Sequence, residues 1–300
     1  MRAHSLILVA GLLPAFSGAA WAQNAGAPVL HPQSEAEKSA LLDRVLANEK
    51  KSDEAMNFYE RVERVETRKN ATNPLSAEVK VSRVFPAGTG VDHIPIGPDG
   101  KPEDADAYHA DLLKLEKALS WASDDGNAQR DAYEKVAKKQ KEREELIDAT
   151  RVAFLYTFVS KETNGGRVLF KYSMMPNPEY KPTSRSTSIF AKVHGFVWID
   201  PAAEEITRIE GEVTDDISIG LFLAKVYKGS RFVQERQELL PDLWMPTFSQ
   251  YDFDGRKFFS TISIHERTYY SQFHRIGPPK KALAMIRAEL GKPGASVSDP

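Results

Sequence analysis

Two periodicities of apolar residues divide the chain into helical and extended parts. The first helix is predicted to begin after Ser34, a good N-cap that is followed by two glutamates. Its apolar stripe is formed by Leu41, Leu42, Val45 and Leu46. Residues 58–67 fit either a continued helix or a charged strand, and we favour the strand. Residues 75–85 alternate between apolar and polar side chains and predict a half-buried strand.

The middle of the chain changes from loop to helix. The Pro- and Gly-rich stretch 86–102 predicts a loop. Residues 103–150 predict two helices, one through Tyr108 and Leu119 and a second from about Ala128. The second helix is charged on all sides, which is typical of a solvated helix. A last helix is predicted from Pro278 onward.

From Arg151 onward the pattern is almost continuously that of strands. A hairpin is predicted around Asn164-Gly165-Gly166, and further strands at 191–199, 206–213, 220–227, 231–239, 245–253 and 257–269, with a turn at Asp254-Gly255. Short connections between strands indicate an antiparallel meander. We therefore predict an α+β protein with one large curved antiparallel β-sheet covered by helices, and with a helical insertion at about 103–150.

The first 22 residues have the features of a secretory signal peptide. An apolar run from Leu6 to Phe16 precedes Ala20-Trp21-Ala22, which has small residues where a signal peptidase requires them. The run is too short to span a membrane. We expect export to the periplasm with cleavage after Ala22. Residues 23–34 are then a flexible leader, 35–290 a single β domain, and 291–300 a disordered tail.

The composition excludes several classes of function. The 300 residues include no cysteine, so disulfides, thiolate metal sites and cysteine nucleophiles are excluded. The 40 Lys and Arg balance 42 Asp and Glu, which argues against nucleic-acid binding. His-Glu-x-x-His, Gly-x-Ser-x-Gly, phosphate-loop and dinucleotide motifs are missing. His265 and Glu266 should point to opposite faces of a strand and cannot share a ligand. We predict no enzyme activity, no cofactor and no metal site.

Aromatic and aliphatic residues are concentrated in the last third of the chain. They form either the filled core of the sheet or an apolar groove for an acyl chain or lipid, and the pattern leaves both open. If there is a groove on the concave face, its candidate ligand-binding residues are Phe170, Tyr172, Phe196, Trp198, Leu221, Leu223, Trp244, Phe248 and Tyr251.

Two short motifs carry a resemblance to a known family. Trp198-Ile199-Asp200-Pro201 is followed by the strand 206–211, and Trp244-Met245-Pro246-Thr247 comes later. In this the chain resembles exported proteins of the outer-membrane lipoprotein-sorting superfamily, which includes a periplasmic lipoprotein carrier and a sensor domain. The resemblance covers roughly residues 35–85 and 151–275. It implies a half-open β-barrel with helices as a lid and an interior apolar cavity for acyl chains.

Together these patterns predict a periplasmic binding or carrier protein for a lipid or the acyl chain of a lipoprotein. The alternative is an envelope interaction or sensor module that binds another protein, with the helices of 103–150 as the contact. A hydrolase ranks third, because it would need a pocket with a coupled acid and base.

Overall fold

A computed structural model describes residues 34–68, 78–219, 224–241, 243–258 and 260–291. The predicted signal peptide, all of the leader except Ser34, and all of the tail except Gly291 lie outside the described residues.

Helices and strands occupy most of the described chain. The helices are α1 (Glu35–Ala55), α2 (Ala105–Ala122), α3 (Asn127–Ala153) and α4 (Pro279–Leu290), with short 3-10 turns η1 (Met56–Phe58) and η3 (Thr187–Lys192). The strands are β1 (Tyr59–Arg68), β2 (Glu78–Pro86), β3 (Val91–Ile96), β4 (Phe154–Asn164), β5 (Arg167–Pro176), β6 (Val193–Asp200), β7 (Glu205–Val213), β8 (Ile217–Ile219), β9 (Ala224–Val226), β10 (Arg231–Leu240), β11 (Leu243–Lys257) and β12 (Ser260–Arg275). The strand that we favoured over residues 58–67 is confirmed as β1.

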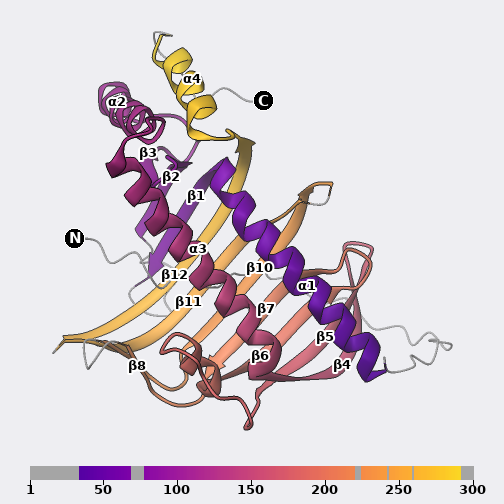
Figure 1. Cartoon of the computed structure of the whole chain (residues 1–300). Coiled ribbons are helices and arrows are strands. Elements are labelled where there is room, and N and C mark those ends of the chain that lie inside the picture. The colour runs from indigo at the N-terminus through magenta and orange to yellow at the C-terminus, as the bar shows by residue number, and fades with distance from the viewer. Residues whose placement is uncertain (1–33, 69–77, 220–223, 242, 259, 292–300) are drawn as a thin grey trace, which may run out of the picture.

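All strands belong to one antiparallel sheet of 12 strands, in the order β3-β2-β1-β12-β11-β10-β7-β6-β5-β4 with the pair β8–β9 attached to β11. The sheet is not closed: β3 and β4 are its two edges. The helical segment α2–α3 leaves one edge strand and ends at the other (Figure 1). The predicted α+β fold, with a large open sheet and a helical insertion, is confirmed.

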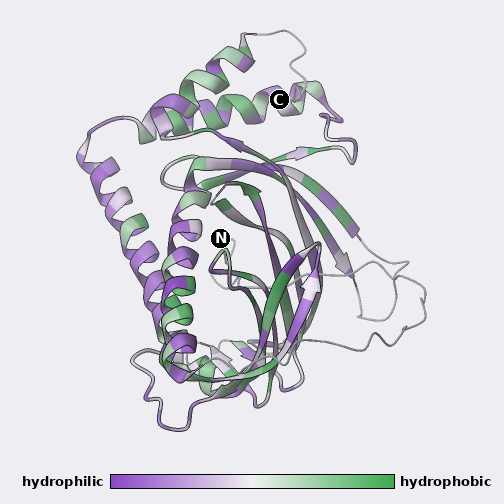
Figure 2. Cartoon of the chain, turned by 90° about the vertical axis from the view of Figure 1, so that its right-hand side faces the viewer, coloured by the Kyte–Doolittle hydropathy of each residue, from purple (hydrophilic) through white to green (hydrophobic). Residues whose placement is uncertain are grey.

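The two faces of the sheet can be followed by its register, because directly paired residues point to the same face. One row of consecutive partners crosses the sheet: Ile96, Val81, Arg64, Tyr269, Phe248, Glu235, Arg208, Trp198 and Lys171. We call the face that carries this row the outer face and the opposite one the α1 face. Figure 2 shows the sheet curving around the side on which α1 lies.

Each end of the sheet has its own core, on opposite faces. At the β1–β3 end, Val81, Phe85, Ile94 and Ile96 of the outer face pack with α2 and α4 through Leu112, Leu115, Leu119, Leu283 and Ile286. At the β4–β7 end, Tyr172, Met174, Val197, Ile199 and Ile206 pack with Leu41, Leu42 and Val45 of α1. The two helical layers therefore do not share a face.

Two local predictions are wrong. The stretch 86–102 is not all loop, because β3 forms within it as an edge strand. An edge tolerates Pro95, whose missing N–H would break a central strand. The turn expected at Asp254-Gly255 lies instead between Lys257 and Ser260, where β11 meets β12. Gly255 is needed for pairing: a Cβ there would lie 2.1 Å from the carbonyl oxygen of Lys225 on β9. Of the predicted strand 220–227, residues 220–223 lie outside the described residues.

Candidate binding site on the face covered by α1

The helix α1 forms because its first turn is capped. The Ser34 side chain accepts a hydrogen bond from the backbone N–H of Glu37, and the Glu37 carboxylate accepts one from the backbone N–H of Ser34 at 2.8 Å, which is a capping box. Four buried residues, Leu41, Leu42, Val45 and Ser52, mark its sheet-facing side. The cap thus fixes where the apolar stripe meets the sheet.

Beneath this stripe the α1 face of β4–β7 is largely aromatic. Half-buried side chains from these strands, from the loop after β5 and from η3 pack against the buried ones: Tyr156, Phe158, Phe170, Tyr180, Phe190 and Ile209. Phe158 meets Phe170 and Tyr172 edge to face, at ring-centroid distances of 5.8 Å in both pairs. This surface combines a buried floor with a rim of incompletely buried rings.

The helix α3 lies beside α1 and is held there by charge (Figure 1). Arg143 Nε lies 2.9 Å from Asp53 Oδ2, and Lys50 Nζ lies 2.6 Å from Asp148 Oδ1. Near the end of α3, Arg151 Nε lies 2.6 Å from Asp43 Oδ1. Only Gln129 and Ala153 of α3 are buried. The contact between the two helices therefore consists mainly of ion pairs at the protein surface.

The nine predicted ligand-binding residues divide between the two faces. Phe170, Tyr172 and Tyr251 point to the α1 face, whereas Phe196, Trp198 and Phe248 point to the outer face. Trp244, at the start of β11, is buried with the Arg167 guanidinium 5.1 Å from its ring centroid. Leu221 and Leu223 lie outside the described residues. Ligand binding by these residues stays a prediction. Because the register places them on both faces of the sheet, they cannot all line a single binding surface.

The outer-face aromatics belong to a row of cations and rings. Lys171 Nζ lies 4.4 Å from the ring centroid of Trp198, and the Arg208 guanidinium lies 5.6 Å from the same centroid. Trp198 also donates its indole N–H to Glu162 Oε2 at 2.8 Å. Trp198 is therefore held in place by charged residues of β4, β5 and β7.

Sequence patterns gave no sign of a polar cluster on the α1 face of β11 and β12. Tyr251 pairs with Glu266, and Ser249 with Thr268, so their side chains share the α1 face. Tyr270 lies on the same face and its hydroxyl is 2.8 Å from Ser249 Oγ. Alternation of apolar and polar residues could not reveal the cluster, because its members come from two strands whose register is set only in the folded sheet.

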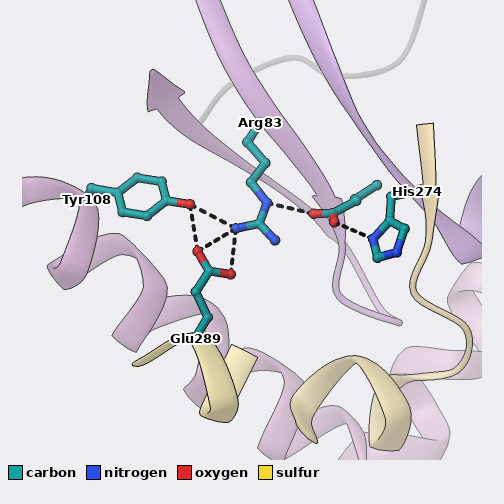
Figure 3. A network of polar contacts seen from close by, with 5 residues as sticks. Arg83, Tyr108, His274 and Glu289 are labelled. Carbon is teal, nitrogen blue, oxygen red and sulfur yellow. Dashed lines mark hydrogen bonds and ion pairs between the residues drawn. The ribbon is translucent and has the colours of Figure 1, made fainter. Parts of the chain in front are cut away.

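A second buried polar network joins α2 and α4 to the sheet (Figure 3). Arg83 donates to Glu60 Oε2 at 2.6 Å, to Tyr108 at 2.8 Å and to Glu289 Oε2 at 2.8 Å. Burial raises the pKa of Tyr108 to about 12, so the phenol stays neutral. The ion pair between His274 Nδ1 and Glu60 Oε1, at 3.0 Å, extends the network to β12. Its members come from five elements, which gives it a structural role.

A serine, a histidine and an aspartate come together at the free end of the β11–β12 hairpin. Ser263 Oγ lies 2.8 Å from His265 Nε2, and His265 Nδ1 lies 2.9 Å from Asp252 Oδ1. This is the connectivity of a catalytic triad. Ser263 Oγ, however, also donates to Asp254 Oδ1 at 2.6 Å, which directs its proton away from the imidazole. The contacts secure the hairpin. His265 and Glu266 lie on opposite faces, as predicted.

A pocket of about 510 Å³ lies where the turn between α2 and α3 meets the start of α4. Its lining includes Asp124, Asp125, Arg130 and Lys280, so opposite charges face the same space. It includes none of the nine predicted residues. Within the described parts of the chain, acidic and histidine side chains form no group of three placed to hold a metal ion. Likewise, none of the described helices is long and apolar enough to cross a membrane.

Known proteins give only distant likenesses. The sequence matches no family model and no curated protein. One similar solved structure is a domain described as an outer membrane lipoprotein-sorting protein from Vibrio parahaemolyticus, with 11% identity, a TM-score of 0.32 and coverage of 78% of this chain and 93% of that one. Another is a DUF1329 family protein from Desulfovibrio piger, with 9% identity, a TM-score of 0.28 and coverage of 79% and 92%. The resemblance to lipoprotein-sorting proteins is thus found in the comparison of structures as well, and with such low TM-scores it carries no argument about function.

Proposed function

We propose that the protein is a periplasmic binding or carrier protein, and that the α1 face of β4–β7 accommodates the acyl chain of a lipid or lipidated peptide. The observation that carries this proposal is the aromatic surface beneath α1, with Tyr172 in its floor and half-buried Phe158 and Phe170 at its rim. Binding sites for apolar ligands are lined predominantly by hydrophobic and aromatic side chains.

The energetics favour a ligand that shares this surface with α1. Burying one leucine or valine side chain is worth about 1.5–3 kcal/mol, so the three apolar residues of α1 contribute about 5–9 kcal/mol before the entropy of ordering the helix. An acyl chain gains about 0.8 kcal/mol for each buried methylene, or about 10 kcal/mol for twelve. A long acyl chain can therefore compete with α1 for the aromatic surface.

The ion pairs between α1 and α3 fit a movable cover. Exposed ion pairs contribute about 0–1 kcal/mol each and weaken in salt. Lys50 and Asp53 of α1 both pair with α3, and ion pairs of this strength let α1 move relative to α3. In this proposal α1 shifts away from the aromatic floor when the chain binds.

Binding of a fluorescent fatty acid, dansyl-undecanoate, tests the proposal. The variant Phe170→Ser removes an aromatic ring from the proposed site, and Phe196→Ser removes one from the outer face of the adjacent strand. We expect at least tenfold weaker binding for Phe170→Ser and no change for Phe196→Ser. A wild-type protein that does not bind the probe, or two variants that bind alike, would contradict the proposal. Circular dichroism of both variants controls for folding.

A further inference from the structure

Four side chains of the α1 face form a group that the acyl-chain proposal does not use. They are Glu63 of β1, Tyr251 of β11, and Glu266 and Tyr270 of β12, which we call the Glu266 cluster. Tyr251 pairs with Glu266, and Glu63 pairs with Tyr270, so the register places all four on one face. Phe253 lies beside Tyr251, with the two rings edge to face at 5.1 Å.

The hydroxyl of Tyr251 has no hydrogen-bond partner in the part of the chain that the structure describes. Tyr251 is 5% exposed, and its hydroxyl oxygen is buried and forms no hydrogen bond with any described residue. Burial raises the pKa of Tyr251, and the neighbouring Tyr270 and Glu266 raise it further, so the phenol is neutral. A buried hydroxyl without a partner costs about 1–3 kcal/mol, which a ligand group that bonds to it would recover.

The carboxylate of Glu266 has no cationic partner in the described parts of the chain, whereas Glu63 has one. Arg61 Nη2 lies 2.6 Å from Glu63 Oε1, and no described lysine or arginine forms an ion pair with Glu266. Burial raises the pKa of Glu266 and Glu63 raises it further, while a hydrogen bond with Thr268 only partly opposes this. With Arg61 included, the cluster therefore carries one more negative than positive charge when both carboxyls are ionised.

We propose that the Glu266 cluster binds the ammonium group of a cationic amphiphile. The proposal rests on the proposed function, because it assigns the polar end of the ligand whose chain lies on the aromatic surface. Tyrosine rings attract organic cations through their faces, and a carboxylate without an ion pair among the described residues supplies the counter-charge. The free Tyr251 hydroxyl can accept a hydrogen bond from an N–H of a primary ammonium group.

The distance between the two regions fits one ligand. From Tyr251 on β11 to Tyr172 on β5 the sheet order passes four strand spacings. At roughly 4.8 Å for each spacing, these strands are about 19 Å apart. Between them, Phe232 of β10 lies over Gly211 of β7: a Cβ at Gly211 would approach the Phe232 ring to 2.3 Å. An apolar path therefore joins the cluster to the aromatic surface on the same face.

Titration calorimetry with three amphiphiles of one chain length tests the proposal. The ligands are dodecylammonium, dodecyltrimethylammonium and the neutral dodecyl maltoside, each below its micelle concentration. We expect the wild type to bind both cations at least tenfold more tightly than the maltoside. Glu266→Gln should remove this preference and leave the maltoside affinity unchanged. Glu235→Gln is the matched control, because Glu235 is a half-buried carboxylate on the outer face of β10.

Tyr251→Phe separates the two cations, because only dodecylammonium can donate to the hydroxyl. This variant should bind dodecylammonium several-fold more weakly and dodecyltrimethylammonium as the wild type does. Equal binding of cationic and neutral ligands by the wild type, or a preference that survives Glu266→Gln, would overturn the inference and leave the acyl-chain site intact. If none of the three amphiphiles binds, the proposed function itself fails. Tyr251→Phe removes a buried hydroxyl that has no hydrogen-bond partner among the described residues, and Glu266→Gln keeps the shape of a half-buried side chain, so we expect both variants to fold.

Discussion

Glu205 is a carboxylate whose burial should make stability depend on pH. It is the first residue of β7 and is 4% exposed, and its Oε2 is buried with no hydrogen-bond partner among the described residues. Burial raises its pKa from 4.5 to about 7, and the attraction of Lys51 on α1 only partly opposes this. The adjacent Glu204 is bound by Arg44 and Asn48 of α1, so Glu205 lies next to the attachment of the helix.

The sign of the effect follows from proton uptake. Between pH 4.5 and about 7 the folded protein holds a proton on Glu205 that the unfolded chain has released. Stability therefore falls as pH rises through this range, and the loss is complete above the folded pKa. Raising the pKa from 4.5 to about 7, at about 1.4 kcal/mol for each tenfold change in the proton-binding constant, sets an upper limit near 3.5 kcal/mol, which water near the site reduces to about 2–3 kcal/mol.

Glu205→Gln removes the charge and keeps the shape. We expect the variant to be more stable than the wild type by about 2 kcal/mol at pH 8 and by less than about 0.5 kcal/mol at pH 4.5. Urea unfolding followed by tryptophan fluorescence at both pH values measures the difference. Glu212→Gln, a substitution in an exposed ion pair on the same strand, should change little at either pH. A gain for Glu205→Gln that is equal at both pH values, or is absent at pH 8, would refute the reasoning.

Three further predictions concern the scaffold. Arg83→Met removes the arginine partner of two largely buried carboxylates, Glu60 and Glu289, and should lower the free energy of unfolding by about 3–5 kcal/mol. Arg231→Met, in an exposed ion pair, should change it by less than about 0.5 kcal/mol, and urea titration of both variants measures the difference. Gly255→Ala should disrupt the pairing of β9 with β11 and lower the Tm by several degrees, while Gly90→Ala, where a Cβ meets open space, should not. At 1 M salt the amide hydrogens of α3 should exchange faster, and those of β5 and β6 at unchanged rates, because ion pairs hold α3 to α1.

Local signals in the sequence predicted the elements well where a single mechanism dominates. The serine cap at Ser34 marks the start of α1, and Gly165-Gly166, both with positive φ, form the turn of the β4–β5 hairpin. At β11 the pairing with a neighbouring strand decided the structure, and the local turn signal did not. Asp254-Gly255 has the composition of a turn, yet the strand continues through it because β9 pairs alongside.

The sides to which the aromatics point could not be predicted, for a geometric reason. Alternation fixes faces only within one strand, and each β-bulge shifts the register between neighbours. Such irregularities occur between Trp198 and Ile199 on β6, and between Glu235 and Arg236 opposite β11. The non-local pairing of β1 with β12 is equally invisible to local patterns. A candidate set chosen by residue type thus includes Phe170 and Phe196, which point to opposite faces of the sheet.

The charge that surrounds α3 also has a cause that only the topology shows. Its chain must pass from the β3 edge to the β4 edge, nine strand spacings apart, or about 43 Å across a flat sheet. With 27 residues the helix is about 40 Å long, close to that width. A helix that bridges two edges beside α1, with little burial against the sheet, keeps polar residues on every side. Deleting residues 103–150 would therefore remove most of the segment that links β3 to β4. A partner-binding role of these helices is better tested by reversing exposed charges such as Lys138 and Lys141, which leaves the link in place.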